Sequence, residues 1–217
     1  MPPQPDGKMR GMRKVDHLLD ELRPAITDAR VLDAIAVVPR AAFLPGDLRP
    51  RAYDNVALPI GRGQTISQPL VVARMTDLLR VGPEDRVLDV GTGSGYHAAV
   101  LARLARHVWT IERHRELSRR AAASLRAAGV SNVTVLVGDG SRGLPVAAPF
   151  DAINVAAAAW PEIPPALERQ LAPGGRLVAP VGASGQQLVL VERSEDDDGE
   201  LQRTMLDPVR FVPLIEG

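Results

Sequence analysis

The stretch Val87-Leu-Asp-Val-Gly-Thr-Gly-Ser-Gly-Tyr96 decides the fold of this chain. Apolar residues on both sides of Asp89 predict a short buried strand over residues 87–90. Three alternating glycines follow, and the apolar-rich run 96–105 then predicts a helix. A strand that passes through a glycine-rich turn into a helix is the front end of a nucleotide-binding α/β unit. Glycine suits this turn because no Cβ prevents the backbone from approaching a ligand closely.

An acidic residue follows the glycines at an informative distance. Glu112 ends a second strand-like run, 108–111, and lies 21 residues after Gly91. Folds of this kind bind a pair of ribose hydroxyls with an acid about 20 positions on. The glycine spacing is Gly-x-Gly-x-Gly with an acid two residues upstream, which is typical of S-adenosylmethionine sites. A dinucleotide enzyme, whose spacing is Gly-x-Gly-x-x-Gly, and a coincidental glycine-rich turn remain as alternatives.

The composition excludes several classes of protein. The chain has 217 residues, with 26 Lys and Arg against 26 Asp and Glu, so a nucleic-acid partner is not expected. The absence of cysteine excludes disulfides, thiolate metal sites and cysteine catalysis. No apolar run approaches the length of a membrane span, and residues 1–10 lack the apolar segment of a signal peptide. We therefore expect a cytoplasmic protein that does not bind membranes. We also expect a monomer.

The region before the glycine motif differs from it in composition and in the spacing of its apolar residues. Residues 1–11 are polar and rich in Pro and Gly, and we expect them to be disordered. Apolar residues at helical spacing predict short helices over 15–22 and 28–37. Residues 53–69 contain Pro and Gly between the apolar residues Val56, Leu58, Ile60 and Ile66. This pattern predicts a loop that packs against the rest of the protein. At its end Ser67 occupies a helix N-cap position before Pro69, so a capping role is its plain interpretation.

Strands and helices alternate after the glycine motif. The pattern predicts helices over 114–128 and 164–171, and strands over 133–137, 150–155 and 176–181. Such alternation implies a mostly parallel sheet with helices on both faces. Residues 187–192 and a stretch ending near Val212 lack an intervening helix and predict an antiparallel hairpin. We expect one domain over 12–217, divided into a helical part with the loop (12–80) and an α/β core (81–217).

Ligands of an open parallel sheet bind at the carboxyl ends of its strands. There Glu112 is expected to accept from two ribose hydroxyls, and Asp139 from an adenine amino group. Asp89, inside its strand, is expected to orient the glycine loop or the cofactor's amino group. The four histidines have no metal-ligand spacing, so no metal is expected and they are interpreted as structural or surface residues.

These residues also carry a family resemblance. The region from about Val38 to Leu214 resembles the protein-L-isoaspartate O-methyltransferases, which methyl-esterify isoaspartyl residues in damaged proteins. The segments that carry it are Pro39-Arg-Ala-Ala-Phe-Leu-Pro45, Leu58-Pro-Ile-Gly-x-Gly-Gln-Thr-Ile-Ser-Gln-Pro69, Gly91-Thr-Gly-Ser-Gly-Tyr96, Gly138-Asp-Gly140, Pro161-Glu-Ile-Pro-Pro165 and Phe211-Val-Pro-Leu214. Gln64-Thr-Ile-Ser-Gln-Pro69 is the most specific of them.

The resemblance implies a Rossmann-like class I S-adenosylmethionine-dependent methyltransferase with an N-terminal helical addition. It makes Ser67 the active-site serine, and Ser67 and Val212 substrate-binding residues. It places the cofactor, released as S-adenosyl-L-homocysteine, against Gln64, Thr65, Ile66, Asp89, Gly91, Thr92, Gly93, Ser94, Gly95, Glu112, Asp139 and Gly140. Proteins and peptides that contain isoaspartyl residues are the implied substrates, and protein repair the implied role.

The implied chemistry is undemanding. An isoaspartyl linkage leaves a free α-carboxylate, which is ionised at neutral pH and is already a nucleophile. The enzyme must hold it in line with a methyl donor and exclude water, a task that suits the Ser67 hydroxyl. The segment 153–160 departs from the family in its longer alanine run and in Trp160. A methyltransferase for a dedicated peptide or small-molecule carboxylate therefore remains the alternative.

Overall fold

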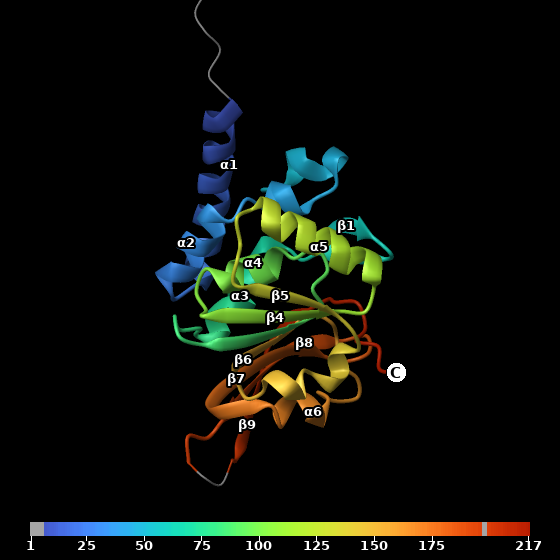
Figure 1. Cartoon of the computed structure of the whole chain (residues 1–217). Coiled ribbons are helices and arrows are strands. Elements are labelled where there is room, and N and C mark those ends of the chain that lie inside the picture. Colours follow the sequence, from blue (N-terminus) through green and yellow to red (C-terminus); the bar gives the residue numbers. More distant parts are fainter. Residues whose placement is uncertain (1–6, 197–198) are drawn as a thin grey trace, which may run out of the picture.

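In the computed structural model, which describes residues 7–196 and 199–217, a central sheet lies between two layers of helices (Figure 1). The seven strands are ordered β5-β4-β3-β6-β7-β8-β9. Their bounds are β3 Arg86–Val90, β4 His107–Glu112, β5 Val133–Val137, β6 Phe150–Val155, β7 Leu171–Val181, β8 Gln186–Arg193 and β9 Leu201–Val209. The first five pair in parallel, and β8 is antiparallel to both β7 and β9. The predicted mostly parallel sheet with a C-terminal antiparallel hairpin is therefore confirmed.

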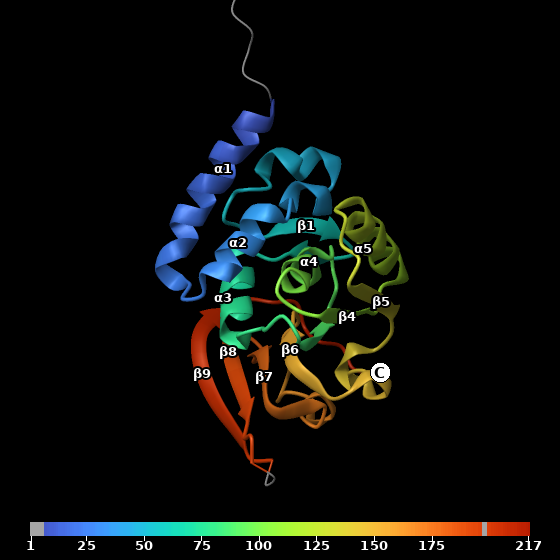
Figure 2. The ribbon, with the colours of Figure 1, turned by 60° about the vertical axis from the view of Figure 1, so that its left-hand side comes forward.

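Helices cover both faces of the sheet, as predicted. One layer contains α1 Gly7–Leu22, α2 Ala29–Val37, α3 Pro69–Leu79, α4 Tyr96–Ala102 and α5 Arg115–Ala127, and short helix α6 Pro165–Glu168 lies on the other face (Figure 2). Short 3-10 turns complete the helical set: η1 Arg23–Ala25, η2 Arg40–Phe43, η3 Gly46–Arg51, η4 Gly140–Arg142 and η5 Pro145–Ala147. No helix in the described part of the chain is both long and apolar enough to cross a membrane.

Polar contacts connect the start of α2 to α3. The Asp77 carboxylate of α3 accepts from the backbone N–H groups of Thr27 and Asp28 and from the Thr27 hydroxyl. Asp28 in turn caps α2 by accepting from the Arg30 N–H at 2.9 Å. These bonds supply partners to groups that the start of a helix leaves unsatisfied. They hold α2 against α3, the helix that follows Ser67 in the chain.

Several predicted boundaries were wrong. Residues 53–69 are not only a loop: β1 Leu58–Gly61 and β2 Gln64–Ile66 form an antiparallel hairpin. The helix expected over 164–171 ends at Glu168, because β7 already begins at Leu171. The last strand ends at Val209, before Val212.

The N-terminal boundary also differs from the prediction. Helix α1 begins at Gly7, within the segment 1–11 expected to be disordered, and residues 1–6 lie outside the described residues.

Candidate active site

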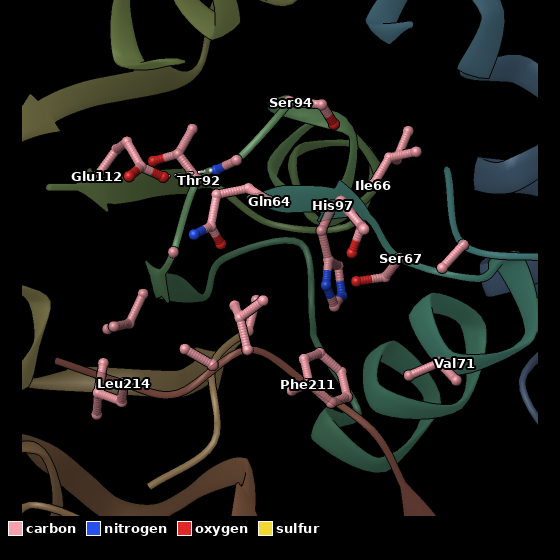
Figure 3. Close-up of a pocket in the computed structure, with 18 of the residues that line it drawn as sticks. Gln64, Ile66, Ser67, Val71, Thr92, Ser94, His97, Glu112, Phe211 and Leu214 are labelled. Carbon is pink, nitrogen blue, oxygen red and sulfur yellow. Dashed lines mark hydrogen bonds between the residues drawn. The ribbon is translucent and has the colours of Figure 1, made fainter. Parts of the chain in front are cut away.

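A cavity of about 980 Å³ opens at the carboxyl ends of β3, β4 and β6. The chain runs from β3 to β4 and β5 on one side, and continues with β6 on the other, so this is the point where the strand order reverses. Figure 3 shows the cavity between the glycine loop, the β2 segment and a C-terminal strap, residues 211–214. Of the predicted residues, the lining includes Gln64, Thr65, Ile66, Ser67, Gly91, Thr92, Gly93, Ser94, Glu112, Gly140 and Val212.

The glycine loop has a backbone that only glycine adopts easily. Gly91, Gly93 and Gly95 have φ values of +94°, +53° and +88°. The N–H of Gly91 donates to the carbonyl of Ile111 at 2.9 Å, which joins the loop to the end of β4. Gly95 does not line the cavity. It packs against α5, where a Cβ at this position would lie 3.2 Å from the Ala121 Cβ. Its contribution is to let α4 begin close to α5.

Glu112 lies at the end of β4 with its carboxylate beside the glycine loop (Figure 3). One oxygen accepts from the Gly93 N–H and the other from the His114 N–H, each at 2.9 Å. A carboxylate oxygen can accept more than one hydrogen bond, so both oxygens retain capacity for further donors. The pair of backbone bonds fixes the orientation of the carboxylate.

Asp89 is fully buried and does not line the cavity. Its carboxylate accepts from the Thr110 hydroxyl and from the Asn154 side-chain amide, each at 2.7 Å. Burial raises the pKa of Asp89 to about 6, against the effect of these two hydrogen bonds. Thr110 uses its one proton on Asp89, so the Thr92 hydroxyl, 2.6 Å away, donates to Thr110. Asp89 is thus linked to Thr92 of the glycine loop through Thr110.

His97 is a cavity residue that the sequence did not single out. It is 8% exposed, and in Figure 3 its ring lies beside Ser67. Its Nδ1 is 3.2 Å from the Asn154 side-chain amide, which has only protons to offer, so Nδ1 accepts and the proton is on Nε2. Nε2 then donates to the Thr76 hydroxyl at 3.1 Å. Burial lowers the pKa of His97 to about 3, so the ring is neutral.

Ser67 follows β2 directly and its side chain points into the cavity (Figure 3). It does not cap α3: the N-cap position belongs to Gln68, and the Leu70 N–H in the first turn donates to the Asn55 side chain at 3.1 Å. Its carbonyl accepts from Nη2 of Arg40 at 3.0 Å. Arg40 is 1% exposed, and its guanidinium also donates to the carbonyls of Ala52 and Val56. This buried cation, which the sequence did not single out, joins the segment before the hairpin to the segment after it.

Asp139 and Gly140 lie at the turn after β5. Asp139 does not line the cavity: one carboxylate oxygen accepts from the N–H and hydroxyl of Ser141, and the other from the Gly217 N–H at 3.2 Å. Gly140 does line it, and a Cβ there would lie 2.5 Å from a methyl group of Val90. The chain can therefore approach the end of β3 only because residue 140 is glycine.

The C-terminal strap forms the side of the cavity opposite Gln64 (Figure 3). The Gln186 side chain holds Phe211 by accepting from its N–H at 2.6 Å and donating to its carbonyl at 3.0 Å. Ala158, just beyond β6, donates to the Val212 carbonyl and accepts from the Leu214 N–H, both at 2.8 Å. Val212 is thereby fixed in the lining of the cavity.

Comparisons with known proteins point to one family. The family described as protein-L-isoaspartate(D-aspartate) O-methyltransferase matches residues 13–217. The protein-L-isoaspartate O-methyltransferase of Roseiflexus sp. (strain RS-1) is 54% identical over 192 residues, covering 88% of this chain and 87% of its own. That of Paracoccus denitrificans (strain Pd 1222) is 52% identical over 210 residues, covering 94% of each chain.

Solved structures show the same likeness. One, a protein-L-isoaspartate O-methyltransferase, is 27% identical with a TM-score of 0.83, over 94% of this chain and 66% of its own. Another, a putative enzyme of that name from Plasmodium falciparum in complex with S-adenosyl-L-homocysteine, shares the fold at 23% identity. Its TM-score is 0.79, over 95% of this chain and 99% of its own. This chain therefore belongs to the protein-L-isoaspartate(D-aspartate) O-methyltransferase family.

Proposed function

We propose that the enzyme transfers a methyl group from S-adenosylmethionine to the free α-carboxylate of L-isoaspartyl residues in damaged proteins and peptides. The observation that carries the proposal is the meeting of two segments over one cavity. Ser67 lines it from the end of the β1–β2 hairpin, and the glycine loop with Glu112 lines it from the sheet. Membership of the family indicates which reaction this geometry serves, the methylation of isoaspartyl residues.

The residues present fit an adenosine-bearing cofactor. Glu112 retains acceptor capacity for two ribose hydroxyls, and the glycine loop offers a surface without side chains at Gly91 and Gly93. Gln64, Thr65 and Ile66 face the same space from β2, and Gly140 completes the wall. When bound, the cofactor supplies a sulfonium methyl group. Asp89, Gly95 and Asp139 would support this site indirectly, through Thr92, the start of α4 and the turn at Ser141.

Ser67 would position the acceptor. A hydroxyl can donate one hydrogen bond to a carboxylate oxygen without transferring a proton, so the substrate remains charged and nucleophilic. The acceptor is ionised at neutral pH, so no general base is required, and His97 is neutral beside it. The apolar strap at Phe211, Val212 and Leu214 would close over the peptide and exclude water from the carboxylate.

Three further proposals concern the whole molecule. Residues 12–217 would act as one domain, with the segment 12–80 covering the α/β core, because their apolar side chains share a core with the sheet. The enzyme would work as a monomer in the cytoplasm on isoaspartyl proteins. Nucleic acid is not expected as a partner, because the chain has equal numbers of acidic and basic residues.

A methyl-transfer assay on paired peptides tests the activity. Two peptides that differ only in an isoaspartyl or an aspartyl linkage are incubated with labelled cofactor. A base-labile ester on the isoaspartyl peptide alone is the expected result. Equal labelling of both peptides would contradict the proposal, and tight cofactor binding without turnover would favour an enzyme for a dedicated peptide or small-molecule carboxylate.

A further inference from the structure

Arginines gather beside the mouth of the cavity, around the first turn of α5 and the tip of the β1–β2 hairpin. Arg62, Arg113, Arg115 and Arg119, here called the arginine rim, line a second hollow of about 420 Å³ together with His114 and Glu116. Arg113 and His114 line both hollows, so the rim is continuous with the active-site cavity. Figures 1 and 2 both show β1 beside α5, and Arg120 fixes that contact by donating to the Ile60 carbonyl at 2.7 Å.

The rim carries more positive charge than its own acid can balance. Among the described residues that line this second hollow, Glu116 is the only one with a carboxylate, and it accepts from Nε of Arg62 at 2.8 Å. Arg113, Arg115 and Arg119 are exposed and form no hydrogen bond or ion pair within the described residues. Four guanidinium groups against one carboxylate leave a local excess of three positive charges, although the chain as a whole has a formal net charge of zero.

These arginines also occupy positions that do not favour cations. Arg115 is the first residue of α5, and Arg113 lies two residues before it. The N-terminus of a helix carries partial positive charge and free N–H groups, which favour acidic side chains there. Arginines at this end therefore raise the positive potential instead of compensating for it. Such a surface attracts an anionic ligand.

We propose that the arginine rim is a docking surface for acidic segments of the substrate protein, next to the isoaspartyl site. This inference rests on the proposed function, because it names the substrate proteins that the same site prefers. An acidic peptide suits the rim better than a nucleic acid does, since the rim has no Phe, Tyr or Trp on which bases could stack.

The hairpin sets the distance between the rim and the reacting carboxylate. Arg62 and Ser67 are separated by five residues, most of them in the extended strand β2. At about 3.3 Å per residue, they lie up to about 16 Å apart. An extended substrate would therefore bring side chains about five residues from its isoaspartyl residue to the rim.

The test uses three isoaspartyl peptides with Glu, Gln or Lys at the positions four to six residues from the isoaspartyl residue. The expected KM of the Glu peptide is about five- to tenfold lower than that of the Lys peptide at low ionic strength, with a similar kcat. The ratio of the two KM values should shrink in 0.5 M salt, because the Debye length there is only about 4 Å and the charges are screened. In the Arg115→Gln/Arg119→Gln variant the same ratio should fall toward one.

Arg126→Gln is the matched control, because Arg126 is an exposed arginine in the last turn of the same helix. It should leave the preference intact. Equal KM values for the three peptides, or the same loss of preference in the Arg126 variant, would overturn the proposal. Competition by a single-stranded oligonucleotide as strong as that by the acidic peptide would assign the rim to nucleic acid instead. Turnover of the Gln peptide tests the proposed function separately, since it does not depend on the rim.

Discussion

Nη2 of Arg40 lies 3.0 Å from the carbonyl oxygen of Ser67, 27 residues further along the chain. The same guanidinium donates to the carbonyls of Ala52 and Val56 at 2.7 and 3.0 Å. Its position fits a rigid, planar fork of donors and not a single ammonium group. The backbone of Ser67 is therefore held from inside the protein, while its side chain faces the cavity.

Arg40→Lys should reduce kcat by about tenfold, because the single nitrogen of an ammonium group cannot reach carbonyls that Arg40 holds with two separate nitrogens, and Ser67 would lose its fixed position. The dissociation constant of S-adenosylmethionine should change less than twofold, since the glycine loop is untouched. Steady-state kinetics and calorimetry measure the two quantities. The control is Leu18→Ala, which removes a buried side chain of α1 and should lower stability by about 2–5 kcal/mol without reducing kcat. Equal kcat losses in both variants would reduce Arg40 to a stability role.

Gly140→Ala should weaken cofactor binding. Its Cβ would lie 2.5 Å from a Val90 methyl group, and Val has little rotational freedom with which to move away. The overpacking should cost about 1–3 kcal/mol of stability and raise the cofactor's dissociation constant about tenfold. Gly138→Ala is the control, because its Cβ would meet nothing nearer than Ile111 at 3.7 Å. Full cofactor affinity in Gly140→Ala would contradict the close approach.

Asp89 predicts a specific pH dependence of stability. Burial raises its pKa to about 6 in the folded chain, above the 3.8 of an unperturbed Asp. Between these values the folded state binds more protons than the unfolded state, so the contribution of Asp89 to stability falls as the pH rises from 4 to 6. Relative to Asp89→Asn, the wild type should therefore lose roughly 3 kcal/mol over this range and nothing further above it.

Denaturant unfolding at a series of pH values measures this difference. His97 titrates in the opposite sense, since its lowered pKa makes stability rise with pH up to about 6.5, but it is present in both proteins. Asp20→Asn, which removes an exposed carboxylate of α1, is the control for the loss of one negative charge. A stability difference between the wild type and Asp89→Asn that does not change between pH 4 and 6 would contradict the raised pKa of Asp89.

The parts of the fold that follow from local pattern were predictable. The pattern of apolar residues and glycines in residues 87–96 predicted the strand, the turn and the start of the helix. The distance of Glu112 from Gly91 predicted its place at the site. The β1–β2 hairpin was not predictable, because its strands have only four and three residues, Pro59 and Gly61 lie within β1, and Gly63 lies directly before β2. Arg40 and His97 were missed for another reason: their roles arise from contacts with Ser67 and Asn154, which lie 27 and 57 residues away. Only the folded chain brings them together.

The central claim is that Ser67 positions the acceptor over a cofactor site that it does not build. Single-turnover methyl transfer to an isoaspartyl peptide by Ser67→Ala, with cofactor affinity measured in parallel, tests it most directly, and exposed Ser184→Ala is the control. The account predicts a transfer rate about 10- to 100-fold lower in Ser67→Ala, with the cofactor's dissociation constant and the Ser184→Ala rate both unchanged. An undiminished rate in Ser67→Ala, or a loss explained entirely by weaker cofactor binding, would contradict it.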